Sequence, residues 1–384
     1  MRIGIDCHVL EKRKSGVGVA RYLMKLLNYW SRKNGIEIFL YFKDRIISGN
    51  FLSSSDFLSS PVFIKKIAKN PFNIKSLALY YNFSLPIAVM RDKIDVLFLP
   101  FYMRPFFCWV PTVNVIHDIS YISHSNWFRL RYRLPLKLLT KRAIKKSFAL
   151  VASSKYTKDE IIKFYDVREN KIFPVLLAAD EKFNSQKSID KIEEVKRKYN
   201  LNKNYLFYTG SIFSRRHVLE SIKAFEKLLD NGLDYQFLIS GDDLTYPVQG
   251  INQMIERVNK KYNNAVIKVD YVYEDDLLYI YQGAELFVWL SEYEGFGLPP
   301  LEAMACGTPV LSTKKTSLAE VLGDYPIAVD DPSNVEEIKD KMTKALKDKN
   351  LRNEMITKGF IRTKQFSWHK TAEDTLRILI SENK

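Results

Sequence analysis

Short apolar runs alternate with longer segments of helical periodicity along most of the chain. Apolar runs of roughly four to eight residues between turn signals are typical of strands that a parallel sheet buries on both faces. They form two series: residues 2–9, 36–42, 94–100, 112–116, 149–152 and 171–177, then 205–210, 235–241, 264–271 and 286–290. Strands and helices thus alternate twice over, which predicts an α/β protein with two Rossmann-like domains.

Between these strands, apolar residues recur at the three- and four-residue spacing of amphipathic helices. The segments run from Ala20 to Trp30, onward from Ser153, from Val218 to Leu229 and over 366–380. A polar stretch with one short helix separates the two series of strands. We therefore expect an N-terminal domain at 1–180, a connector at 181–204, a C-terminal domain at 205–365 and a closing helix at 366–384.

The hydrophobic pattern is ambiguous in two places. Residues 44–90 carry serine runs and three prolines, and we interpret them as mixed loops and short helices. Residues 96–116 hold a single charged side chain and are long enough to span a membrane as one helix. Pro100, Pro105 and Pro111 argue against a helix of that length. Two buried strands joined by an aromatic loop, folded in rather than dipping into a membrane, explain the segment better.

Composition is that of a globular protein in a reducing compartment. The chain has 384 residues, 46% apolar and 27% charged, and this length suggests two domains. Cys7, Cys108 and Cys306 lie far apart and fit no metal-ligand spacing. The N-terminus enters a strand directly, without the apolar core of a signal peptide, so a cytoplasmic location is expected.

The positive charge is concentrated in the first half of the chain. Residues 1–180 carry 30 Lys and Arg against 13 Asp and Glu, and the whole chain has a formal net charge of +15. Residues 119–158 contain ten basic residues and no acidic one, in a pattern that permits an amphipathic helix broken at Pro135. A solvated basic face is one interpretation, but the missing acids favour contact with an anionic membrane surface. Nucleic acid is not expected as a partner, because no helix-turn-helix, zinc-finger or RNP pattern accompanies the charge.

Candidate chemistry is densest between Ala284 and Asp324. An apolar strand gives way there to a loop with Gly295 and Gly297, followed by a helix predicted to start at Pro299 and to end at Gly307. A strand, a glycine loop and a helix N-terminus form the local arrangement that binds phosphate groups.

Two carboxylates bracket this predicted anion site. Glu294 lies in the loop, and Glu302 lies eight positions later in the expected first turn of the helix. Phosphate-binding loops usually carry cations, so carboxylates here indicate that hydroxyls, such as those of a sugar or ribose diol, are bound as well. Either glutamate alone would be interpreted as a solvated surface residue.

A second loop supplies the cations. The strand at 205–210 leads through Ser211 to the adjacent pair Arg215–Arg216 before the next helix. Two cations beside a helix N-terminus repel each other unless an anion, such as a diphosphate, lies between them. A solvated arginine pair is the alternative. A glycine-rich turn also follows the first strand, but Arg21 occupies the third glycine position of a dinucleotide fingerprint, so a nicotinamide cofactor is not expected.

One histidine has a functional position. His117 and Asp118 end the strand at 112–116, and ligands of open α/β sheets bind outside the carboxyl ends of strands. A lone histidine is usually structural, but this position favours a functional one.

Together these motifs resemble one enzyme family. The runs E-G-F-G-L-P and E-A-M-A-C-G-T-P-V, G-S-I-F-S-R-R-H, and V-I-H-D-I-S resemble motifs of the retaining, group 1 (family four) glycosyltransferases of GT-B fold. The resemblance covers nearly the whole chain and is strongest from 205 to 333. It implies two Rossmann-like domains facing across a cleft and a C-terminal helix that crosses back to the first domain.

The resemblance also implies a role for each candidate residue. A nucleoside-diphosphate sugar would be the donor, with Glu294 binding sugar hydroxyls, Glu302 the ribose diol and His117 the sugar from the facing domain. Charge on the leaving diphosphate would be stabilised by Arg215, Arg216 and the N–H groups of Phe296, Gly297 and Leu298. The other donor-side residues are Gly16, Gly18, Gly210, Ser211, Tyr271 and Val272, and the acceptor-side residues are Asp118, Tyr102 and Arg104. No Asp-x-Asp site is evident, so no metal or other cofactor is expected.

The acceptor follows from the first domain. Its basic and aromatic residues suggest a lipid-diphosphate-linked glycan at the inner face of the cytoplasmic membrane, as in bacterial polysaccharide or O-antigen assembly. The subgroup with the H-D motif often uses GDP-mannose, so a mannosyltransferase is expected, with a UDP-sugar as the alternative donor. A non-catalytic nucleotide- or membrane-binding protein on this scaffold and a nucleic-acid-binding protein are the alternatives from other classes.

Overall fold

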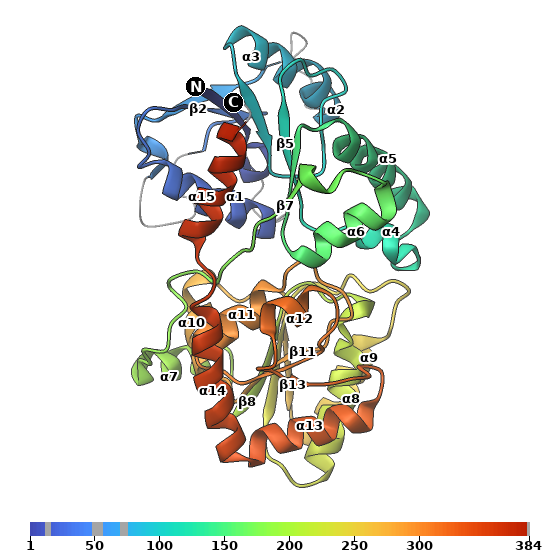
Figure 1. Cartoon of the computed structure of the whole chain (residues 1–384). Helices are drawn as coiled ribbons and strands as arrows, with labels where there is room; N and C mark the ends of the chain where they lie inside the picture. Colours follow the sequence, from blue (N-terminus) through green and yellow to red (C-terminus); the bar gives the residue numbers. More distant parts are fainter. Residues whose placement is uncertain (12–16, 48–56, 70–75, 382–384) are drawn as a thin grey trace. The chain divides into compact units, whose positions relative to one another are not determined.

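The computed structural model describes residues 1–11, 17–47, 57–69 and 76–381, which divide into two compact units (Figure 1). Unit 1 contains Met1–Ser123, Leu130–Leu177 and Trp368–Lys384. Unit 2 contains His124–Arg129 and Ala178–Ser367. The C-terminal segment therefore belongs to the same unit as the N-terminus. Each unit is described below by itself.

Unit 1 is built on a seven-stranded sheet whose strand pairs are all parallel. The strands lie in the order β3-β2-β1-β4-β5-β6-β7. Their bounds are β1 Arg2–Asp6, β2 Glu37–Phe42, β3 Phe63–Ile67, β4 Val96–Leu99, β5 Thr112–Ile116, β6 Ala149–Ala152 and β7 Ile172–Pro174. The chain order reverses between β1 and β4, which makes this point the topological switch of a Rossmann-like sheet.

Two helices from opposite ends of the chain pack together in unit 1. α1 (Val17–Trp30) lies beside α15 (Trp368–Ile380), as Figure 1 shows in blue and red. The Trp30 indole Nε1 is buried and donates to the Ala372 carbonyl at 3.0 Å, which fixes the pair. This packing confirms the prediction that the C-terminal helix returns to the N-terminal part.

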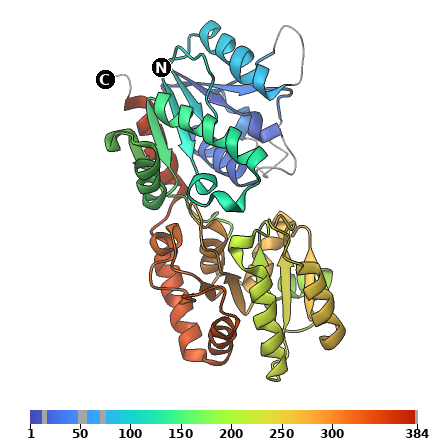
Figure 2. The ribbon, with the colours of Figure 1, turned by 90° about the vertical axis from the view of Figure 1, so that its right-hand side faces the viewer.

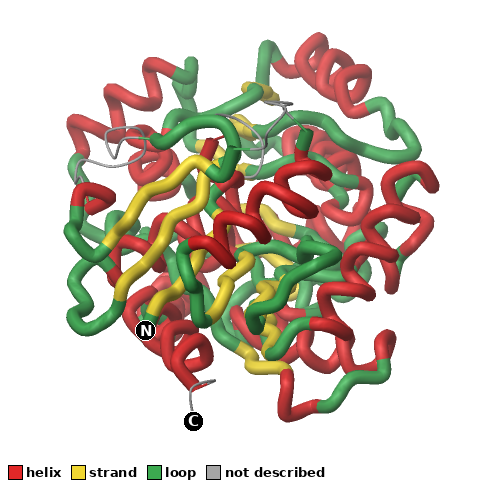
Figure 3. Tube along the Cα trace, turned by 90° about the horizontal axis from the view of Figure 1, so that it is seen from above, coloured by secondary structure: helices red, strands yellow, loops and turns green. Residues whose placement is uncertain are grey.

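The remaining helical elements described in unit 1 belong to the chain segments that connect its strands. Figure 3 draws the helices of the chain in red and its strands in yellow. The remaining elements are η1 (His8–Glu11), η3 (Phe57–Ser59), α2 (Leu77–Leu79), the π-helical turn η4 (Tyr80–Ser84), α3 (Leu85–Arg91), α4 (Ser120–Ser123), α5 (Leu130–Lys146), α6 (Lys155–Tyr165) and η6 (Glu169–Lys171). The predicted strand-to-helix step at Ser153 is confirmed, because the Ser154 hydroxyl caps α6 by accepting the Thr157 N–H.

Unit 2 has a six-stranded parallel sheet in the order β10-β9-β8-β11-β12-β13. The strands are β8 Tyr205–Thr209, β9 Gln236–Ser240, β10 Val266–Val269, β11 Leu286–Trp289, β12 Val310–Ser312 and β13 Ile327–Ala328. Its helical elements are η5 (Ser125–Trp127), α7 (Ile189–Lys198), η7 (Ser214–Arg216), α8 (Val218–Asp230), α9 (Ile251–Tyr262), α10 (Glu274–Gly283), α11 (Leu298–Ala305), α12 (Ser317–Leu322), α13 (Val335–Lys347) and α14 (Lys349–Thr363).

Helices also cover both faces of the unit 2 sheet. α8 packs against α9 and α13, whereas α11 packs against α10, α12 and α14. In Figure 2, α8 is drawn in yellow-green and α13 and α14 in orange to red. α7, the short helix of the 181–204 stretch, packs on α10. Because its strand pairs are all parallel, the six strands end at one edge of the sheet, and the loops that follow them leave from that edge.

The structure resolves the ambiguous apolar segment at 96–116. It forms β4 and β5 joined by a loop, and no helix in the described ranges is long and apolar enough to cross a membrane. The two-strand interpretation is therefore confirmed. The folded-in loop is wrong in part, because Phe106, Phe107 and Trp109 are exposed while only Phe101 and Tyr102 are partly buried.

Three further expectations about elements are wrong. α5 runs through Pro135 instead of breaking there, since an exposed proline near a helix start removes one hydrogen bond without forcing an end. The 44–90 region contains a strand, β3, that pairs with β2 at the sheet edge. α1 begins at Val17, so Gly18 is helical and not part of a turn.

Two glycines join the loops after β8 and β9 in unit 2. Gly210 has φ +129° and Gly241 has φ +140°, a region that side chains other than glycine rarely adopt. The Gly210 N–H donates to the Ser240 carbonyl at 2.9 Å. A Cβ on Gly241 would lie 2.1 Å from the Gly210 carbonyl oxygen, so the two backbones can approach only without side chains.

We expect Gly241→Ala to destabilise unit 2 by about 3–4 kcal/mol, because it adds a steric clash to backbone strain. Gly232→Ala is the matched control, since Gly232 has φ +80° and a Cβ there would meet nothing within 4 Å. It should cost only about 1 kcal/mol. Denaturant unfolding followed by tryptophan fluorescence measures both, and equal losses would contradict the steric argument.

Candidate active site

Neighbouring strands bring two of the predicted loops together in unit 2. β8 pairs with β11, so the loops that follow these strands leave the same edge of the sheet side by side. The Glu292 N–H donates to the Arg215 carbonyl at 2.9 Å and ties one loop to the other. The predicted residues Arg215, Arg216 and Glu294 therefore share one site.

Arg216 and Glu294 form a two-pronged ion pair. Arg216 Nε lies 2.9 Å from one carboxylate oxygen of Glu294, and Nη2 lies 3.2 Å from the other. Arg216 Nη1 donates to the Ser211 carbonyl at 2.7 Å. The two side chains expose only 12% and 11% of their surface, so each charge depends on the other. Burial opposes the charged guanidinium, but the Glu294 carboxylate outweighs burial and raises the pKa of Arg216.

A pair of stacked aromatic rings packs against the Arg216 side of this ion pair. The Arg216 guanidinium lies 4.3 Å from the ring centroid of Trp289, the last residue of β11. Tyr208 stacks on Trp289 at 5.3 Å with an interplanar angle of 20°. A Cβ on Gly210 would come within 3.2 Å of both Arg216 and Trp289, so this position requires glycine. Trp289 was not among the predicted site residues, although its place at the end of a buried strand was a usable signal.

Arg215 has a different environment from its neighbour. Its Nε donates to the Tyr293 carbonyl at 3.3 Å, and its guanidinium lies 4.3 Å from the Phe213 ring centroid and 5.8 Å from that of Trp127. It is half-buried. The two adjacent arginine side chains thus point to different surroundings. Arg216 lies against a carboxylate, and Arg215 lies among aromatic rings and backbone.

His217 is held between two carboxylates. Nδ1 lies 3.5 Å from Glu220 and Nε2 lies 3.4 Å from Glu292, distances at which charge attraction matters more than hydrogen bonding. Burial lowers the histidine pKa, but the two carboxylates outweigh burial and raise it to about 9. The charged ring fastens the start of α8 to the loop after β11. This cluster was not predicted from the sequence, because Glu292 belongs to none of the motifs.

The predicted anion loop has the expected shape. Gly297, with φ +102°, stands just before α11, and a Cβ there would lie 2.6 Å from Leu318. The Ser317 hydroxyl donates to the carbonyls of Glu294 and Phe296 at 2.7 and 3.1 Å. The Glu294 N–H donates to the hydroxyl of Thr316, a non-glycine residue at φ +54°. Such backbone strain is common where a loop is held for a ligand.

Glu302 is placed differently from the expectation. α11 begins at Leu298, so Glu302 lies in the second turn of the helix and not in the first. Its side chain is buried and accepts a hydrogen bond from the Tyr281 hydroxyl at 3.1 Å. The structure therefore does not present Glu302 on an open surface.

The predicted donor-side residues Tyr271 and Val272 follow β10. Val272 is buried, and its N–H donates to the Ser240 hydroxyl at 3.1 Å. Tyr271 is exposed, with its ring edge-on to Tyr273 at 6.1 Å. Ser211 contributes its carbonyl, which accepts from Tyr208 as well as from Arg216.

In unit 1, His117 is a half-buried residue that directly follows β5. Its Nε2 donates to the Pro100 carbonyl at 3.2 Å, and Tyr22 meets the ring edge-on at 5.2 Å. Burial lowers the pKa of His117, so the ring is neutral at physiological pH. Asp118 accepts from the Ser120 N–H and hydroxyl at 2.9 and 2.7 Å, an ordinary turn-forming contact.

The other unit 1 candidates are partly occupied by structural contacts. Arg104 donates to the Thr112 hydroxyl at 3.0 Å and to the Pro105 carbonyl at 3.1 Å. Burial and the Asp118 charge raise the pKa of Tyr102 to about 12. Gly18 is exposed, and a Cβ on it would meet nothing within 4 Å. Gly16 lies outside the described residues.

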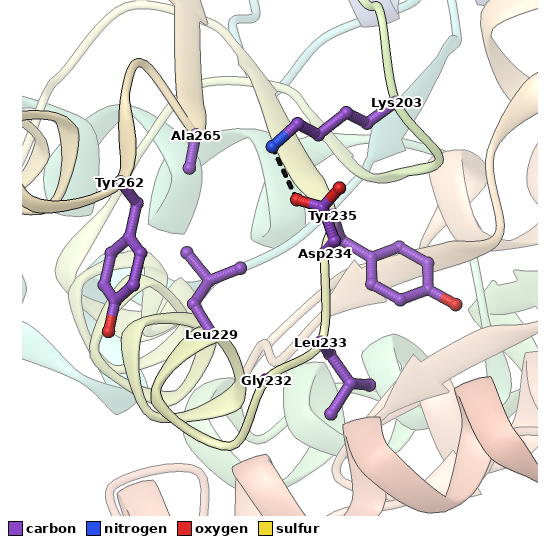
Figure 4. Close-up of a pocket in the computed structure, with 8 residues that line it drawn as sticks. All are labelled: Lys203, Leu229, Gly232, Leu233, Asp234, Tyr235, Tyr262 and Ala265. Carbon is purple, nitrogen blue, oxygen red and sulfur yellow. Dashed lines mark hydrogen bonds and ion pairs between the residues drawn. The ribbon is translucent and has the colours of Figure 1, made fainter.

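The pocket shown in Figure 4 is not part of this site. It lies where β8, β9 and β10 begin, at the opposite edge of the unit 2 sheet, and includes the ion pair of Lys203 with Asp234. Its lining residues are Lys203, Leu229, Gly232, Leu233, Asp234, Tyr235, Tyr262 and Ala265. Among the described residues, no group of His, Cys, Asp and Glu side chains has the arrangement of a metal site.

Comparison with known proteins identifies the family. A family model described as "Glycosyl transferases group 1" matches residues 190–362, which include every unit 2 candidate residue. This chain belongs to the group 1 glycosyltransferases. The glycosyltransferase motifs at Glu294, Glu302 and Arg215–Arg216 thus lie inside the matched region.

Relatives of this glycosyltransferase include two Escherichia coli proteins. It is 29% identical to "O-antigen chain mannosyltransferase B" over 274 residues, which cover 69% of this chain and 68% of that one. It is 31% identical to "Serotype-specific mannosyltransferase WbdA" over 273 residues, which cover 68% of this chain and 32% of that one. The chain thus spans about two thirds of the first relative and about a third of the second.

Solved structures confirm the predicted GT-B fold. Anabaena Alr3699/HepE, solved in complex with UDP and glucose, superposes with a TM-score of 0.75 and covers 99% of this chain and 100% of its own. The sequence identity is 16%, so this likeness concerns the fold alone.

The His217 cluster generates a pH prediction. The pKa of His217 is raised from 6.5 to about 9. The stabilisation of the fold by the charged ring is therefore fully present below about pH 6.5 and is lost as the pH rises through about 9. We expect His217→Asn to lower the unfolding midpoint at pH 6 and to have little effect at pH 9.5. Asparagine tolerates the left-handed backbone that His217 adopts at φ +48°.

Thermal unfolding of both proteins across this pH range measures the difference. Glu292→Gln should remove part of the same pH dependence, because it leaves His217 only one carboxylate. A difference between wild type and His217→Asn that stays constant from pH 6 to 9.5 would contradict the charge-based account.

Proposed function

We propose that this glycosyltransferase moves mannose from GDP-mannose to a hydroxyl of a lipid-diphosphate-linked glycan, with retention of anomeric configuration. The observation that carries the proposal is the nearly buried pair of Arg216 and Glu294 beside the glycine loop of α11. A nucleotide sugar presents both a diphosphate and hydroxyls, and this site offers both cations and a carboxylate.

Arg215 and Arg216 are both candidates for contact with the diphosphate. Arg216 is paired with Glu294, and Arg215 donates to the Tyr293 carbonyl and lies over the Phe213 ring in the same loop. The N–H groups at the start of α11, around Gly297 and Leu298, add a positive helix end. These groups would stabilise charge on the departing diphosphate, so we propose catalysis without a metal ion.

Glu294 is suited to bind hydroxyls of the transferred sugar. A carboxylate has about four acceptor positions, and Arg216 occupies one on each oxygen. The guanidinium fixes the orientation of the carboxylate. In the proposed complex, Glu302 binds the ribose diol once Tyr281 yields its hydrogen bond, and the backbone at Tyr271 and Val272 contacts the base.

His117 is suited to a neutral role. Its Nε2 hydrogen is donated to Pro100, which leaves the Nδ1 lone pair as an acceptor for a sugar hydroxyl. Asp118, Tyr102 and Arg104 would then lie on the acceptor side. We propose that Gly18, with open space around it, lets the donor phosphates approach α1, together with Gly16.

The names of the relatives support mannose as the sugar. Both Escherichia coli relatives carry "mannosyltransferase" in their names, and one is an O-antigen chain enzyme. We extend this to bacterial surface polysaccharide synthesis. A UDP-sugar remains the alternative donor, since Alr3699/HepE was solved with UDP and glucose.

An exposed apolar and basic surface on unit 1 supports peripheral binding to an anionic membrane. Leu130, Leu134 and Leu138 are exposed and recur every four residues on one side of α5. Arg142 of the same helix donates to the Phe106 carbonyl and stacks on its ring at 4.5 Å. This contact joins α5 to the exposed loop that carries Phe107 and Trp109, 67% and 68% exposed.

The segment that carries this surface is basic and contains no acidic residue. Ten Lys and Arg and no Asp or Glu lie between residues 119 and 158. Each cation near an anionic bilayer contributes about 1 kcal/mol, and apolar side chains insert among the headgroups. We propose that unit 1 thereby binds the inner face of the cytoplasmic membrane, where a lipid-linked acceptor is held.

The donor assignment is tested by thermal shift with GDP-mannose, UDP-glucose and ADP-glucose. GDP-mannose should raise the unfolding midpoint, equally with and without EDTA, because a bound ligand stabilises the folded state. Glu294→Gln and Arg216→Ala should each remove that shift and lower transfer by about 100-fold or more. A larger shift with a UDP-sugar would favour the alternative donor, and near-normal transfer in both variants would sink the site assignment.

Loss of stability must be separated from loss of function in these variants. Removing one partner of a buried ion pair costs about 3–5 kcal/mol. The double variant Arg216→Met plus Glu294→Leu removes both charges and should regain stability without regaining transfer. Lys261→Ala, which breaks an exposed pair with Asp230, is the control for an ion pair away from the site.

Membrane binding is tested by sedimentation with vesicles. Wild type should bind vesicles with 30% anionic lipid (on the order of a bacterial inner leaflet) and release at high salt, because screening weakens charge attraction. Leu134→Ser plus Leu138→Ser should weaken binding about tenfold or more. Ile189→Ser plus Ile361→Ser, two exposed apolar residues of unit 2, is the control. Equal binding by both double variants, or a preference for duplex DNA over vesicles, would contradict the proposal.

A further inference from the structure

A buried polar cluster lies at the carboxyl end of β1, outside the residues considered so far. Asp6 is the last residue of β1, and His8 opens η1. Tyr80 and Tyr81 approach them from η4. β1 borders the switch point of the unit 1 sheet, where ligands bind in sheets of this class.

The Asp6 carboxylate receives hydrogen bonds from all three neighbours. Oδ1 accepts from the Tyr80 hydroxyl at 2.8 Å, and Oδ2 accepts from the Tyr81 hydroxyl at 2.5 Å. His8 Nδ1 lies 2.9 Å from both oxygens, and its backbone N–H lies 3.1 Å from Oδ1. Asp6 is 0% exposed. Burial alone would raise its pKa, but His8 and Tyr81 outweigh burial and lower it, so the carboxylate is ionised.

The two tyrosines reach one carboxylate from consecutive positions. Successive residues of a regular α-helix point roughly 100° apart. Tyr80 and Tyr81 begin a π-helical turn, whose wider winding brings both hydroxyls to Asp6 with the rings edge-to-face at 5.4 Å. Such turns are rare in proteins, but those that occur are often found at functional sites.

The carboxylate determines which nitrogen of His8 is available. A carboxylate only accepts, so Nδ1 carries a hydrogen and Nε2 is the ring nitrogen that can offer a lone pair. Nε2 makes no hydrogen bond within the described ranges, and His8 keeps 6% of its surface exposed. An imidazole that is oriented by a buried carboxylate through one nitrogen offers the other nitrogen to a ligand.

We propose that His8 Nε2 accepts a hydrogen bond from a hydroxyl of the glycan acceptor and that Asp6, Tyr80 and Tyr81 are its positioning residues. The inference rests on the proposed glycosyl transfer. The ionised Asp6 behind the ring disfavours a phosphate ligand, since two negative charges would repel. A hydroxyl can donate to a nitrogen lone pair, and a glycan supplies hydroxyls.

The test separates acceptor binding from donor use. The assay uses GDP-mannose with an alkyl-linked mannobiose as probe acceptor, and it also follows GDP-mannose hydrolysis without acceptor. His8→Leu, which fills a similar volume without an acceptor atom, should raise the acceptor KM about tenfold, the effect of one lost hydrogen bond. Donor KM and hydrolysis should stay unchanged. His8→Gln, whose amide oxygen accepts hydrogen bonds, should recover part of the acceptor KM.

Tyr81→Phe distinguishes binding from a merely structural role. It removes one hydrogen bond to Asp6 but leaves His8 Nε2 in place. A structural role predicts that the acceptor KM follows the unfolding midpoint across Tyr81→Phe, His8→Gln and His8→Leu, and that result would overturn the inference. An unchanged acceptor KM in His8→Leu, with normal wild-type transfer, would overturn it alone. Absence of any GDP-mannose turnover by wild type would instead overturn the proposed function and this inference with it.

Discussion

The ion pair of Arg216 and Glu294 is the interaction on which the unit 2 site depends. It joins the loops after two neighbouring strands, and it stands on the stacked rings of Trp289 and Tyr208. Two nearly buried charges are tolerable only while they remain together. The pair therefore requires the loops to keep one geometry in the absence of any ligand. A nucleotide sugar would meet a carboxylate that is already oriented, and less ordering would be needed on binding.

Parallel strand order explains why the sequence patterns implied that these two loops adjoin. Residues at the carboxyl ends of adjacent parallel strands must lie at one edge of the sheet, so motifs after β8 and β11 had to meet. The two glycine loops and the start of α8 were predictable for the same reason. What could not be predicted was the pairing within the site. No local pattern indicates that Arg216 takes Glu294 as its partner, that Arg215 lies among aromatic rings, or that Glu292 holds His217.

Unit 1 was less predictable, for three physical reasons. β3 has only one clearly buried residue, Phe63, so the apolar run that marks a central strand is missing. α5 keeps Pro135 because the solvent face of a helix near its start tolerates the missing donor. Phe107 and Trp109 are exposed although aromatic residues are usually buried, and sequence alone does not distinguish the two cases.

The π-helical turn at Tyr80–Ser84 makes its helical segment intolerant of inserting or deleting even one residue. The continuous stretch from Leu77 to Arg91 contains one turn that is wider than its neighbours. Removing a single residue there would restore regular winding and turn one tyrosine by roughly 100° away from Asp6. Adding a residue would displace the apolar side of α3, including Leu85 and Val89, from the core beneath it. Homologues that keep the buried carboxylate should therefore tolerate sequence change along this helix far better than any change in its length.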